Sequence, residues 1–324
     1  MTLLPEFEYK RPENLGEILV LLSQYGEEAA LLAGGTDLIP RMKMGLKQPK
    51  VILSLSAVND LTYVRQEGER LKIGAFTTID ELHRHPTIGY HYPVLYEAAM
   101  STASENIRLR GTVGGNIMQD TRCMDYNQSQ EWKVSSKACF KMGGSICNAV
   151  KKGKRCFATY CGDLAPALIS LRASICLESK EDKREIPLEN IFTGNGESPF
   201  SIRRGELLKE IIVPLSKTLG GYKKLRLRRS IDYPLASIAM SRNQEGTGRL
   251  VVGAVGPCPR TYEFSSFNQL GSLIEKAYED ATPVMNMPLS PLYRKRMIRL
   301  MATDLLKTLK TGECRMRDTS RRGI

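Results

Sequence analysis

The chain has 324 residues, of which 42% are apolar and 25% charged, and its formal net charge is +12. This length exceeds the size at which one core keeps growing, so we expect two or three packed subdomains. No apolar run approaches the roughly 18 to 20 residues that span a bilayer, and the first residues lack the pattern of a secretory signal. These features predict a globular, cytoplasmic protein without a membrane partner.

The positive charge raises the possibility of nucleic-acid binding. No basic run is interleaved with aromatic residues, however, and no RNA- or DNA-binding motif is present. Much of the charge lies near the C-terminus, where the spacing of apolar residues predicts an amphipathic helix with a solvated basic face. We therefore expect no nucleic-acid partner.

Apolar periodicity and breaker residues predict the elements of the first half of the chain. In order, they are a helix over 15–25, a strand and a glycine turn over 29–40, strands over 50–58 and 70–79, a helical region over 80–104 interrupted at Pro86 and Pro93, and a second glycine turn over 111–117.

The same signals predict a helix over 162–171, strands over 173–179 and 205–214, a linker over 216–221, strand-like stretches over 223–243 and 249–264, and helices in the last 60 or so residues. We place the main domain boundary at the linker. The expected domains are 1–55, 56–215 with an inserted segment at about 119–160, and 216–324.

Two glycine turns are candidate phosphate-binding segments. They read "AGGTDL" over 33–38 and "TVGGN" over 112–116. Paired glycines allow positive φ and close backbone approach, which suits amides that hold phosphate oxygens. Thr36, Thr112 and Asn116 add side-chain donors. Ordinary hairpins also contain such pairs, and neither turn matches the GxGxxG or P-loop patterns, so a bound nucleotide requires another fold.

The motifs "LLAGGTDLIPRMKMGLKQPKVILSLSAVNDL", "LKIGAFTTIDEL", "ENIRLRGTVGGNI", "GDLAPALISL", "KKLRLRRSIDYPLASIA" and "GAVGPCPRT" occur in this order and cover nearly the whole chain. Together they resemble the FAD-binding subunit of the molybdenum hydroxylases, the xanthine oxidase family. The resemblance implies an α+β protein. It would have an FAD-binding fold of the p-cresol methylhydroxylase type, made of two subdomains, and a C-terminal α+β domain of a small sheet and helices.

The resemblance also implies which residues bind FAD. Those expected to wrap the pyrophosphate are Leu32, Ala33, Gly34, Gly35, Thr36, Asp37 and Leu38, with Thr112, Gly115 and Asn116 facing them. Thr102 and Ala103 match positions beside the flavin, Asp163 one that hydrogen-bonds it, and Leu208 and Lys224 positions near the isoalloxazine ring. From the residues alone, Asp163 could instead cap the helix that follows it.

An inserted segment separates two of these motifs. In the family, the Asn of "GGN" and the Asp of "DLAPAL" lie only a few residues apart, whereas 46 residues separate Asn116 from Asp163 here. The insertion holds four of the eight cysteines within 34 residues, namely Cys123, Cys139, Cys147 and Cys156. Thiols of a cytoplasmic protein stay reduced, so such a group points to metal binding or redox chemistry.

The cysteine spacing of fifteen, seven and eight intervening residues contains no CxxC pair of the kind that structural zinc sites use. Widely spaced loop ligands can reach the corners of a larger iron–sulfur core. The pattern favours a four-iron cluster, while a zinc ion and unligated, redox-labile thiols remain open. Cys161 could replace Cys156 as a ligand. Cys176, Cys258 and Cys314 are expected to be ordinary thiols.

One branch of the family, the 4-hydroxybenzoyl-CoA reductases of anaerobic aromatic degradation, is similar in length, motifs and insertion. Its β subunit carries an extra [4Fe–4S] cluster. The resemblance implies a dimer of heterotrimers in which electrons pass from ferredoxin through the cluster and FAD to two [2Fe–2S] centres of a small subunit and the molybdenum cofactor of a large one. The reaction would convert 4-hydroxybenzoyl-CoA to benzoyl-CoA, without catalytic residues on this chain.

Two other functions remain open. One is the FAD subunit of another molybdenum hydroxylase, with NAD as the acceptor and zinc in the insertion. The other is a nucleic-acid-binding protein whose glycine turns are structural. The three histidines, His83, His85 and His91, are expected on a solvated surface rather than at a metal.

The insertion is rich in cations, which predicts a docking surface for an acidic ferredoxin. Its basic residues are Lys133, Lys137, Lys141, Lys151, Lys152, Lys154 and Arg155, against the acidic residues Asp125 and Glu131.

Overall fold

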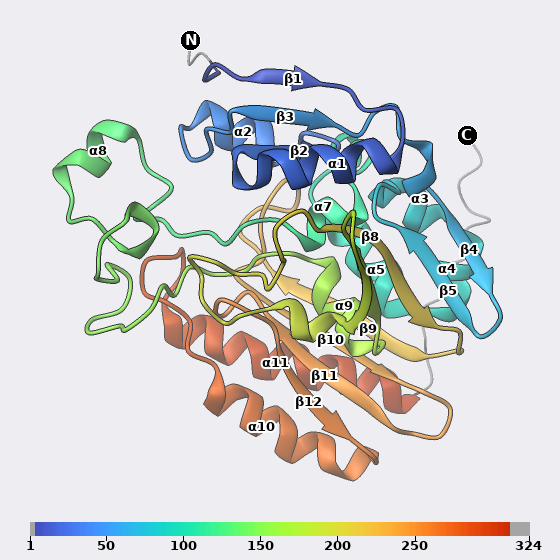
Figure 1. Cartoon of the computed structure of the whole chain (residues 1–324). Coiled ribbons are helices and arrows are strands. Elements are labelled where there is room, and N and C mark those ends of the chain that lie inside the picture. Colours follow the sequence, from blue (N-terminus) through green and yellow to red (C-terminus); the bar gives the residue numbers. More distant parts are fainter. Residues whose placement is uncertain (1–3, 312–324) are drawn as a thin grey trace, which may run out of the picture.

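The computed structural model describes residues 4–311, apart from the side chains of residues 130 and 311. Three sheets follow one another along the chain (Figure 1). The first sheet is parallel, with the strand order β1-β3-β2. This part contains β1 (Glu8–Lys10), α1 (Leu15–Tyr25), β2 (Ala29–Leu32), α2 (Leu38–Lys43) and β3 (Val51–Ser54). Ile18, Leu19 and Leu22 recur at helical spacing, which buries one face of α1 in a small core shared with β3.

The second sheet is antiparallel, with the strand order β4-β5-β8-β6-β7. Its strands are β4 (Val64–Glu67), β5 (Arg70–Gly74), β6 (Ser174–Glu178), β7 (Lys183–Pro187) and β8 (Leu207–Pro214). Strand β5 pairs with β8 from Arg70 opposite Pro214 to Gly74 opposite Glu210. This long-range pairing joins the start and end of the middle part of the chain.

Short helices connect β5 to β6. They are α3 (Ile79–Arg84), α4 (Pro86–His91), α5 (Pro93–Ser101), α6 (Glu105–Arg108), α7 (Val113–Ile117), α8 (Gln130–Ser135) and α9 (Leu164–Ser170). Pro86 and Pro93 each occupy the first position of a helix. A residue at this position donates no intrahelical hydrogen bond, so proline, which has no N–H, is tolerated there. The predicted helical region over 80–104 is therefore divided at these two prolines.

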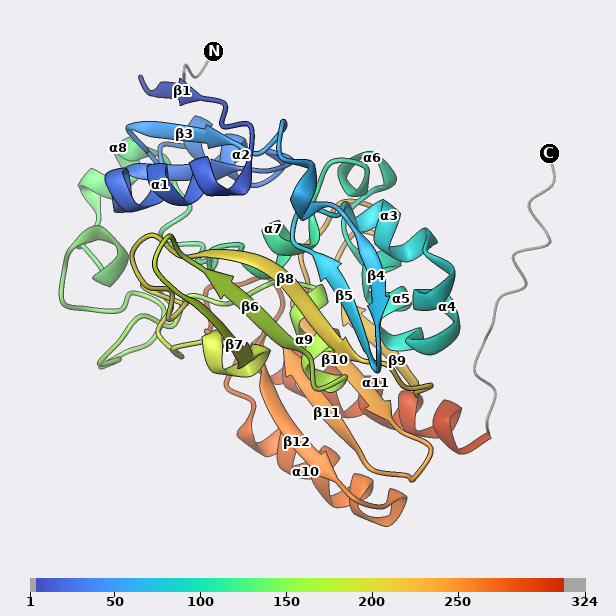
Figure 2. The ribbon, with the colours of Figure 1, turned by 45° about the vertical axis from the view of Figure 1, so that its right-hand side comes forward.

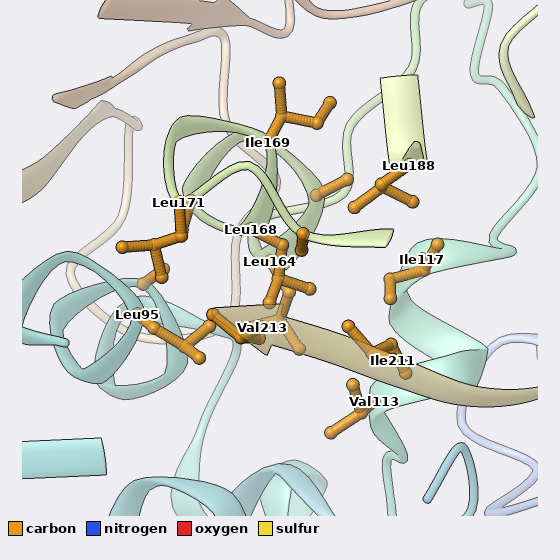
Figure 3. Close-up of a cluster of buried hydrophobic side chains, with 14 of the residues drawn as sticks. Leu95, Val113, Ile117, Leu164, Leu168, Ile169, Leu171, Leu188, Ile211 and Val213 are labelled. Carbon is orange, nitrogen blue, oxygen red and sulfur yellow. The ribbon is translucent and has the colours of Figure 1, made fainter. Parts of the chain in front are cut away.

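The main core lies where these helices meet the second sheet. Figure 3 shows Leu95 of α5, Ile117 of α7 and Leu164 of α9 on the side chains of β8, among them Ile211. All four side chains are fully buried. Helix α9 is buried along its whole length, which explains why its sequence carries no polar face.

The third sheet is an antiparallel meander with the order β12-β11-β10-β9. Its elements are β9 (Leu219–Leu225), β10 (Ala236–Arg242), β11 (Gly248–Gly253), β12 (Arg260–Phe264), and the helices α10 (Leu270–Asp280) and α11 (Pro291–Thr311). Successive residues of β10 face opposite sides, since Ile238 and Met240 pack with α10 and α11 whereas Ala239 joins the main core. This sheet is therefore buried between the C-terminal helices and the middle part of the chain.

The inserted segment of residues 119–160 extends to one side of these layers and contains the short helix α8 (Figure 1, Figure 2). Its two ends are held together by paired backbone hydrogen bonds between Arg122 and Thr159, both at 2.8 Å. The insertion thus leaves and re-enters the main body at one place.

Two sequence expectations about glycine-rich segments were wrong. Residues 113–117 form helix α7 rather than a turn, because the Thr112 side chain caps the helix and burial of Val113 and Ile117 outweighs the low helix propensity of the two glycines. The expected linker over 216–221 includes the first residues of β9. Gly220 is needed there because a β-carbon would lie 2.2 Å from the carbonyl oxygen of Met240.

Candidate flavin and cysteine sites

A large cavity lies where the first sheet, the middle helices and the loop before β10 meet. It contains about 1970 Å³ of space between protein atoms, including space open to solvent. The lining includes these expected flavin-site residues: Ala33, Gly34, Gly35, Thr36, Asp37, Leu38, Thr102, Ala103, Thr112, Gly115, Asn116, Asp163 and Leu208. Leu32 and Lys224 do not line it. The fold thus brings together segments that are up to 175 residues apart, from Ala33 to Leu208.

The first glycine turn, after β2, packs directly on the chain segment that leads into α7. A β-carbon on Gly34 would lie 1.7 Å from the carbonyl oxygen of Arg110, so no side chain fits between the two segments. Gly35 has φ of +72°, a conformation that glycine adopts without strain. The two glycine-containing motifs therefore form adjoining walls of one cavity. Backbone contact requires the glycine at 34, and positive φ favours the glycine at 35.

The side chains of Thr112 and Asn116, which were expected to donate hydrogen bonds to a ligand, bind backbone amides of the protein. The hydroxyl of Thr112 accepts a hydrogen bond from the Gly115 amide at 3.1 Å. The side-chain oxygen of Asn116 accepts one from the amide of Leu164 at 3.0 Å, which ties α7 to the start of α9. These contacts fix the shape of the wall. The backbone amides of Val113, Gly114 and Asn116 also donate within the protein, so the side-chain nitrogen of Asn116 is a donor of this motif that could face a ligand.

Ala103, which follows α5, has φ of +44°. Positive φ is uncommon for a residue with a β-carbon and stores conformational strain, which accumulates at ligand-binding sites. The preceding residue, Thr102, is held by a hydrogen bond from its hydroxyl to the carbonyl oxygen of Ala98 at 2.9 Å. The pair is thus fixed at the cavity wall, where the family resemblance places the flavin.

Asp163 belongs to a buried polar cluster at the cavity. It occupies the position before α9, but its carboxylate makes no capping hydrogen bond. Its Oδ1 instead accepts from the hydroxyl of Tyr222 at 2.7 Å and from Lys224 Nζ at 3.0 Å. Burial raises the pKa of the Asp163 carboxyl, although Lys224 and Tyr222 oppose this shift. Lys224 therefore reaches the site through Asp163 rather than by lining the cavity.

The four cysteines of the insertion, Cys123, Cys139, Cys147 and Cys156, all line a second, smaller cavity of about 280 Å³, measured in the same way. Cys161 does not line this cavity; it lies in the wall of the large one. The fold therefore groups the four expected ligands and separates the fifth cysteine from them. Cys176 lies in β6 and Cys258 in the loop before β12, while Cys314 lies outside the described residues.

Two of the four sulfur atoms accept hydrogen bonds from amide groups. The side-chain amide of Asn286, from the loop before α11, donates to Cys123 Sγ at 3.0 Å, and the Ala158 amide donates to Cys156 Sγ at 3.4 Å. Burial raises the pKa of the Cys156 thiol to about 11 and also raises the pKa of Cys123. Without a bound cation, these two thiols stay protonated at neutral pH.

Within residues 4–311, no three His, Cys, Asp or Glu side chains are close enough together to hold one metal ion. The histidine segment forms no such group either. The three histidines are half-buried, and the Nδ1 atoms of His83, His85 and His91 are buried without a hydrogen-bond partner. The expected solvated surface is therefore only partly present.

Comparisons with known proteins identify the family. The family described as "FAD binding domain in molybdopterin dehydrogenase" matches residues 5–216, about two thirds of the chain. The chain belongs to this family. Molybdopterin-dehydrogenase flavoproteins of this kind bind FAD, which agrees with the position of the large cavity between the two glycine motifs. The matched region also contains the cysteine insertion.

Several curated relatives match most of the chain. The carbon monoxide dehydrogenase medium chain of Hydrogenophaga pseudoflava is 28% identical over 84% of this chain and 83% of its own length. The nicotinate dehydrogenase FAD-subunit of Eubacterium barkeri is 25% identical, with coverages of 95% and 98%. The FAD-binding subunit of the Escherichia coli K12 aldehyde oxidoreductase is 30% identical, with coverages of 78% and 82%.

Solved structures confirm the fold of this FAD-binding subunit. A chain of the carbon monoxide dehydrogenase from Hydrogenophaga pseudoflava superposes with a TM-score of 0.75 and 25% identity, covering 95% of this chain and 99% of that one. The expected α+β fold, with an FAD-binding part and a C-terminal part of sheet and helices, is thus confirmed. Among residues 4–311, no helix is long and apolar enough to cross a membrane.

Sequence reasoning missed several residues of the FAD-binding subunit that line the large cavity. Arg41, Asp120 and Tyr233 are the most informative, because their charged or aromatic groups come from three separate segments. Arg41 lies three residues beyond the first glycine motif, and its side chain is only 3% exposed. A charged residue directly beside the apolar residues Ile39 and Met42 of α2 was the available signal.

One ion-paired group connects the two cavities. Asp120, which lines the large cavity, binds Arg41 at 2.5 Å and Lys141 at 2.7 Å. Lys141 lines the cysteine cavity. Lys133 and Lys141 both lie over the ring of Tyr126 and are buried, so these two lysines cannot form part of an external docking surface.

Proposed function

We propose that FAD occupies the large cavity with its pyrophosphate between the two glycine motifs and its isoalloxazine ring toward Asp163 and Leu208. The contact between Gly34 and the Arg110 carbonyl carries this proposal, because it brings both glycine motifs to one wall of the cavity, where residues without a side chain let the backbone approach a ligand closely. The buried cluster of Asp163 and Lys224 supplies a carboxylate and a cation to orient the polar edge of a flavin.

Bound FAD supplies the exchange of electrons between one-electron and two-electron partners. The chain's own contribution is to hold the dinucleotide, to exclude water with apolar wall residues such as Phe76 and Leu208, and to fix the charges beside it.

We further propose that Cys123, Cys139, Cys147 and Cys156 ligate one [4Fe–4S] cluster. The proposal is supported by their convergence on one cavity and by the amide donors to the sulfur atoms of Cys123 and Cys156. Hydrogen bonds from amides to cluster sulfur are a known means of setting the reduction potential.

With both cofactors, the chain would be the electron-transfer subunit of a 4-hydroxybenzoyl-CoA reductase in the cytoplasm. The supporting observation is the cysteine insertion within a molybdenum-hydroxylase flavoprotein. The names of the relatives, which include medium chains and FAD-subunits, support an assembly with a large molybdenum-cofactor subunit and a small [2Fe–2S] subunit. The second candidate is the FAD subunit of another molybdenum hydroxylase that passes electrons to NAD.

Iron and acid-labile sulfide analysis, together with EPR of the dithionite-reduced chain, tests the cluster. The expected result is about four iron and four sulfide per chain and one FAD released on denaturation. Zinc in place of iron would favour the second candidate. Bound FAD without any metal would retain the flavoprotein assignment and refute the cluster.

The remaining basic residues of the insertion support a ferredoxin-docking surface. Lys151, Lys152, Lys154 and Arg155 are consecutive or nearly so and mostly solvent-exposed, so they would attract an acidic partner and accelerate association at low salt. Replacing the three lysines by Glu should slow reduction by ferredoxin at least tenfold at low ionic strength, measured by stopped-flow absorbance. An unchanged rate, or a wild-type rate that does not fall as salt rises, would contradict this docking surface.

A further inference from the structure

The first glycine motif contains a carboxylate where the proposed FAD pyrophosphate would lie. Asp37 lines the large cavity, and its side chain is 28% exposed. Although Asp37 precedes α2, its carboxylate does not cap that helix. An uncompensated carboxylate repels a nearby phosphate, most strongly where the surrounding dielectric is low. Some other group must therefore neutralise Asp37.

Arg122 is that group. Its Nη2 donates to Asp37 Oδ1 at 2.6 Å, and it also hydrogen-bonds the hydroxyl of Tyr233. The guanidinium carbon lies 3.5 Å from the centre of the Tyr233 ring, which is a close cation–π contact. Asp37 and Tyr233 line the cavity, whereas Arg122 lies behind them and is 18% exposed. Arg122 thus acts on the site through these two residues.

The position of Arg122 depends on the inserted segment. Its backbone is paired with Thr159 at the point where the insertion leaves and re-enters the main body. The next residue is Cys123, which lines the cysteine cavity. Arg122 is therefore supplied to the flavin cavity by the insertion and not by the glycine motifs themselves.

We propose that Arg122 is a positioning residue of the flavin site, which neutralises Asp37 beside the FAD pyrophosphate and holds Tyr233 at the cavity wall. The inserted segment thereby completes the phosphate-binding end of the cavity. This inference rests on the proposed placement of FAD and is independent of what the cysteine cavity binds.

The test is fluorescence titration of the FAD-depleted full-length chain with FAD and with riboflavin, which lacks phosphate. Arg122→Gln leaves Asp37 uncompensated and should weaken FAD binding about tenfold, equivalent to about 1.4 kcal/mol. Riboflavin binding should change less than twofold. The loss for FAD should shrink at high salt because the repulsion is electrostatic, and Arg122→Lys should restore most of the affinity.

A second substitution separates charge from packing. The double variant Arg122→Gln with Asp37→Asn should regain most of the lost FAD affinity, because the repelling carboxylate is gone. Asp37→Asn alone removes the repelling carboxylate and leaves the Arg122 cation unpaired beside the pyrophosphate, so it should tighten FAD binding, which tests the inference even if Arg122→Gln fails to fold. Arg155→Gln is the matched control, since Arg155 lies in the same insertion against Phe157 and should leave FAD affinity unchanged.

The inference is overturned if Arg122→Gln binds FAD as tightly as the wild type, if it weakens riboflavin and FAD equally, or if Asp37→Asn does not restore binding. A wild-type chain that binds no FAD would instead refute the proposed flavin site.

Discussion

Replacing Lys224 by Met removes the cation of a buried ion pair. The side chains of Lys224 and Asp163 are only 3% and 5% exposed, and Nζ lies 3.0 Å from Oδ1. Met fills a similar volume but leaves the carboxylate with the Tyr222 hydroxyl as its remaining side-chain donor. Breaking a buried pair on one side costs about 3–5 kcal/mol. We expect Lys224→Met to lower the free energy of unfolding of the FAD-free chain by this amount at pH 8, measured by urea titration.

The effect should depend on pH in a defined direction. Burial already raises the pKa of Asp163, and loss of Lys224 raises it further. Between the unfolded pKa and this higher folded pKa, the folded chain binds more protons than the unfolded chain, so stability falls as pH rises. Lys224→Met should therefore be less destabilised at pH 5 than at pH 8, and adding Asp163→Asn should recover much of the loss.

Lys223→Met is the matched control on the neighbouring residue. Lys223 pairs with Asp304 at the surface, with side chains 37% and 59% exposed, so its removal should cost no more than about 1 kcal/mol. Equal losses for Lys223→Met and Lys224→Met, or a loss for Lys224→Met that is the same at both pH values, would refute the reasoning.

Two further predictions concern the cavities. Gly34→Ala places a β-carbon 1.7 Å from the Arg110 carbonyl oxygen, so the two walls must separate. FAD content after purification should fall at least tenfold, whereas Gly271→Ala, which meets no atom within 4 Å, should retain it; full FAD content in Gly34→Ala would contradict the contact. Cys147→Ser should lower the iron content and abolish the cluster EPR signal, while Cys258→Ser, outside the cysteine cavity, should change neither. Iron retained in Cys147→Ser would exclude Cys147 as a ligand.

Local signals in the sequence determined most of the secondary structure. The helix over 15–25, the strand ending at Pro214 and the helical breaks at Pro86 and Pro93 all follow from apolar spacing and from the geometry of proline. These features depend on residues within a few positions of one another. The glycine motifs and the insertion were also visible, because motif order along the chain indicated the family and the 46-residue separation of Asn116 from Asp163 revealed the insertion.

Local signals failed where packing outweighed propensity. The glycines of 112–116 suggested a turn, yet Gly114 lies in helix α7 because a residue without a side chain can approach Ala75, where a β-carbon would lie 2.8 Å away. In the expected linker, Gly220 serves close strand pairing rather than flexibility. The sequence shows a glycine at both positions, 114 and 220, but it does not reveal which neighbouring atoms leave no room for a side chain there.

The sequence by itself determined the order of the elements, the two glycine motifs and which four cysteines are grouped in the chain. Only the tertiary structure decided which charges meet. Asp163 pairs with Lys224 across 61 residues, and Asp37 pairs with Arg122 across 85. The sequence shows no regular spacing for such pairs, because the arrangement of the sheets and helices determines which charged residues meet. A buried charge is tolerated only where this arrangement supplies a partner of opposite charge.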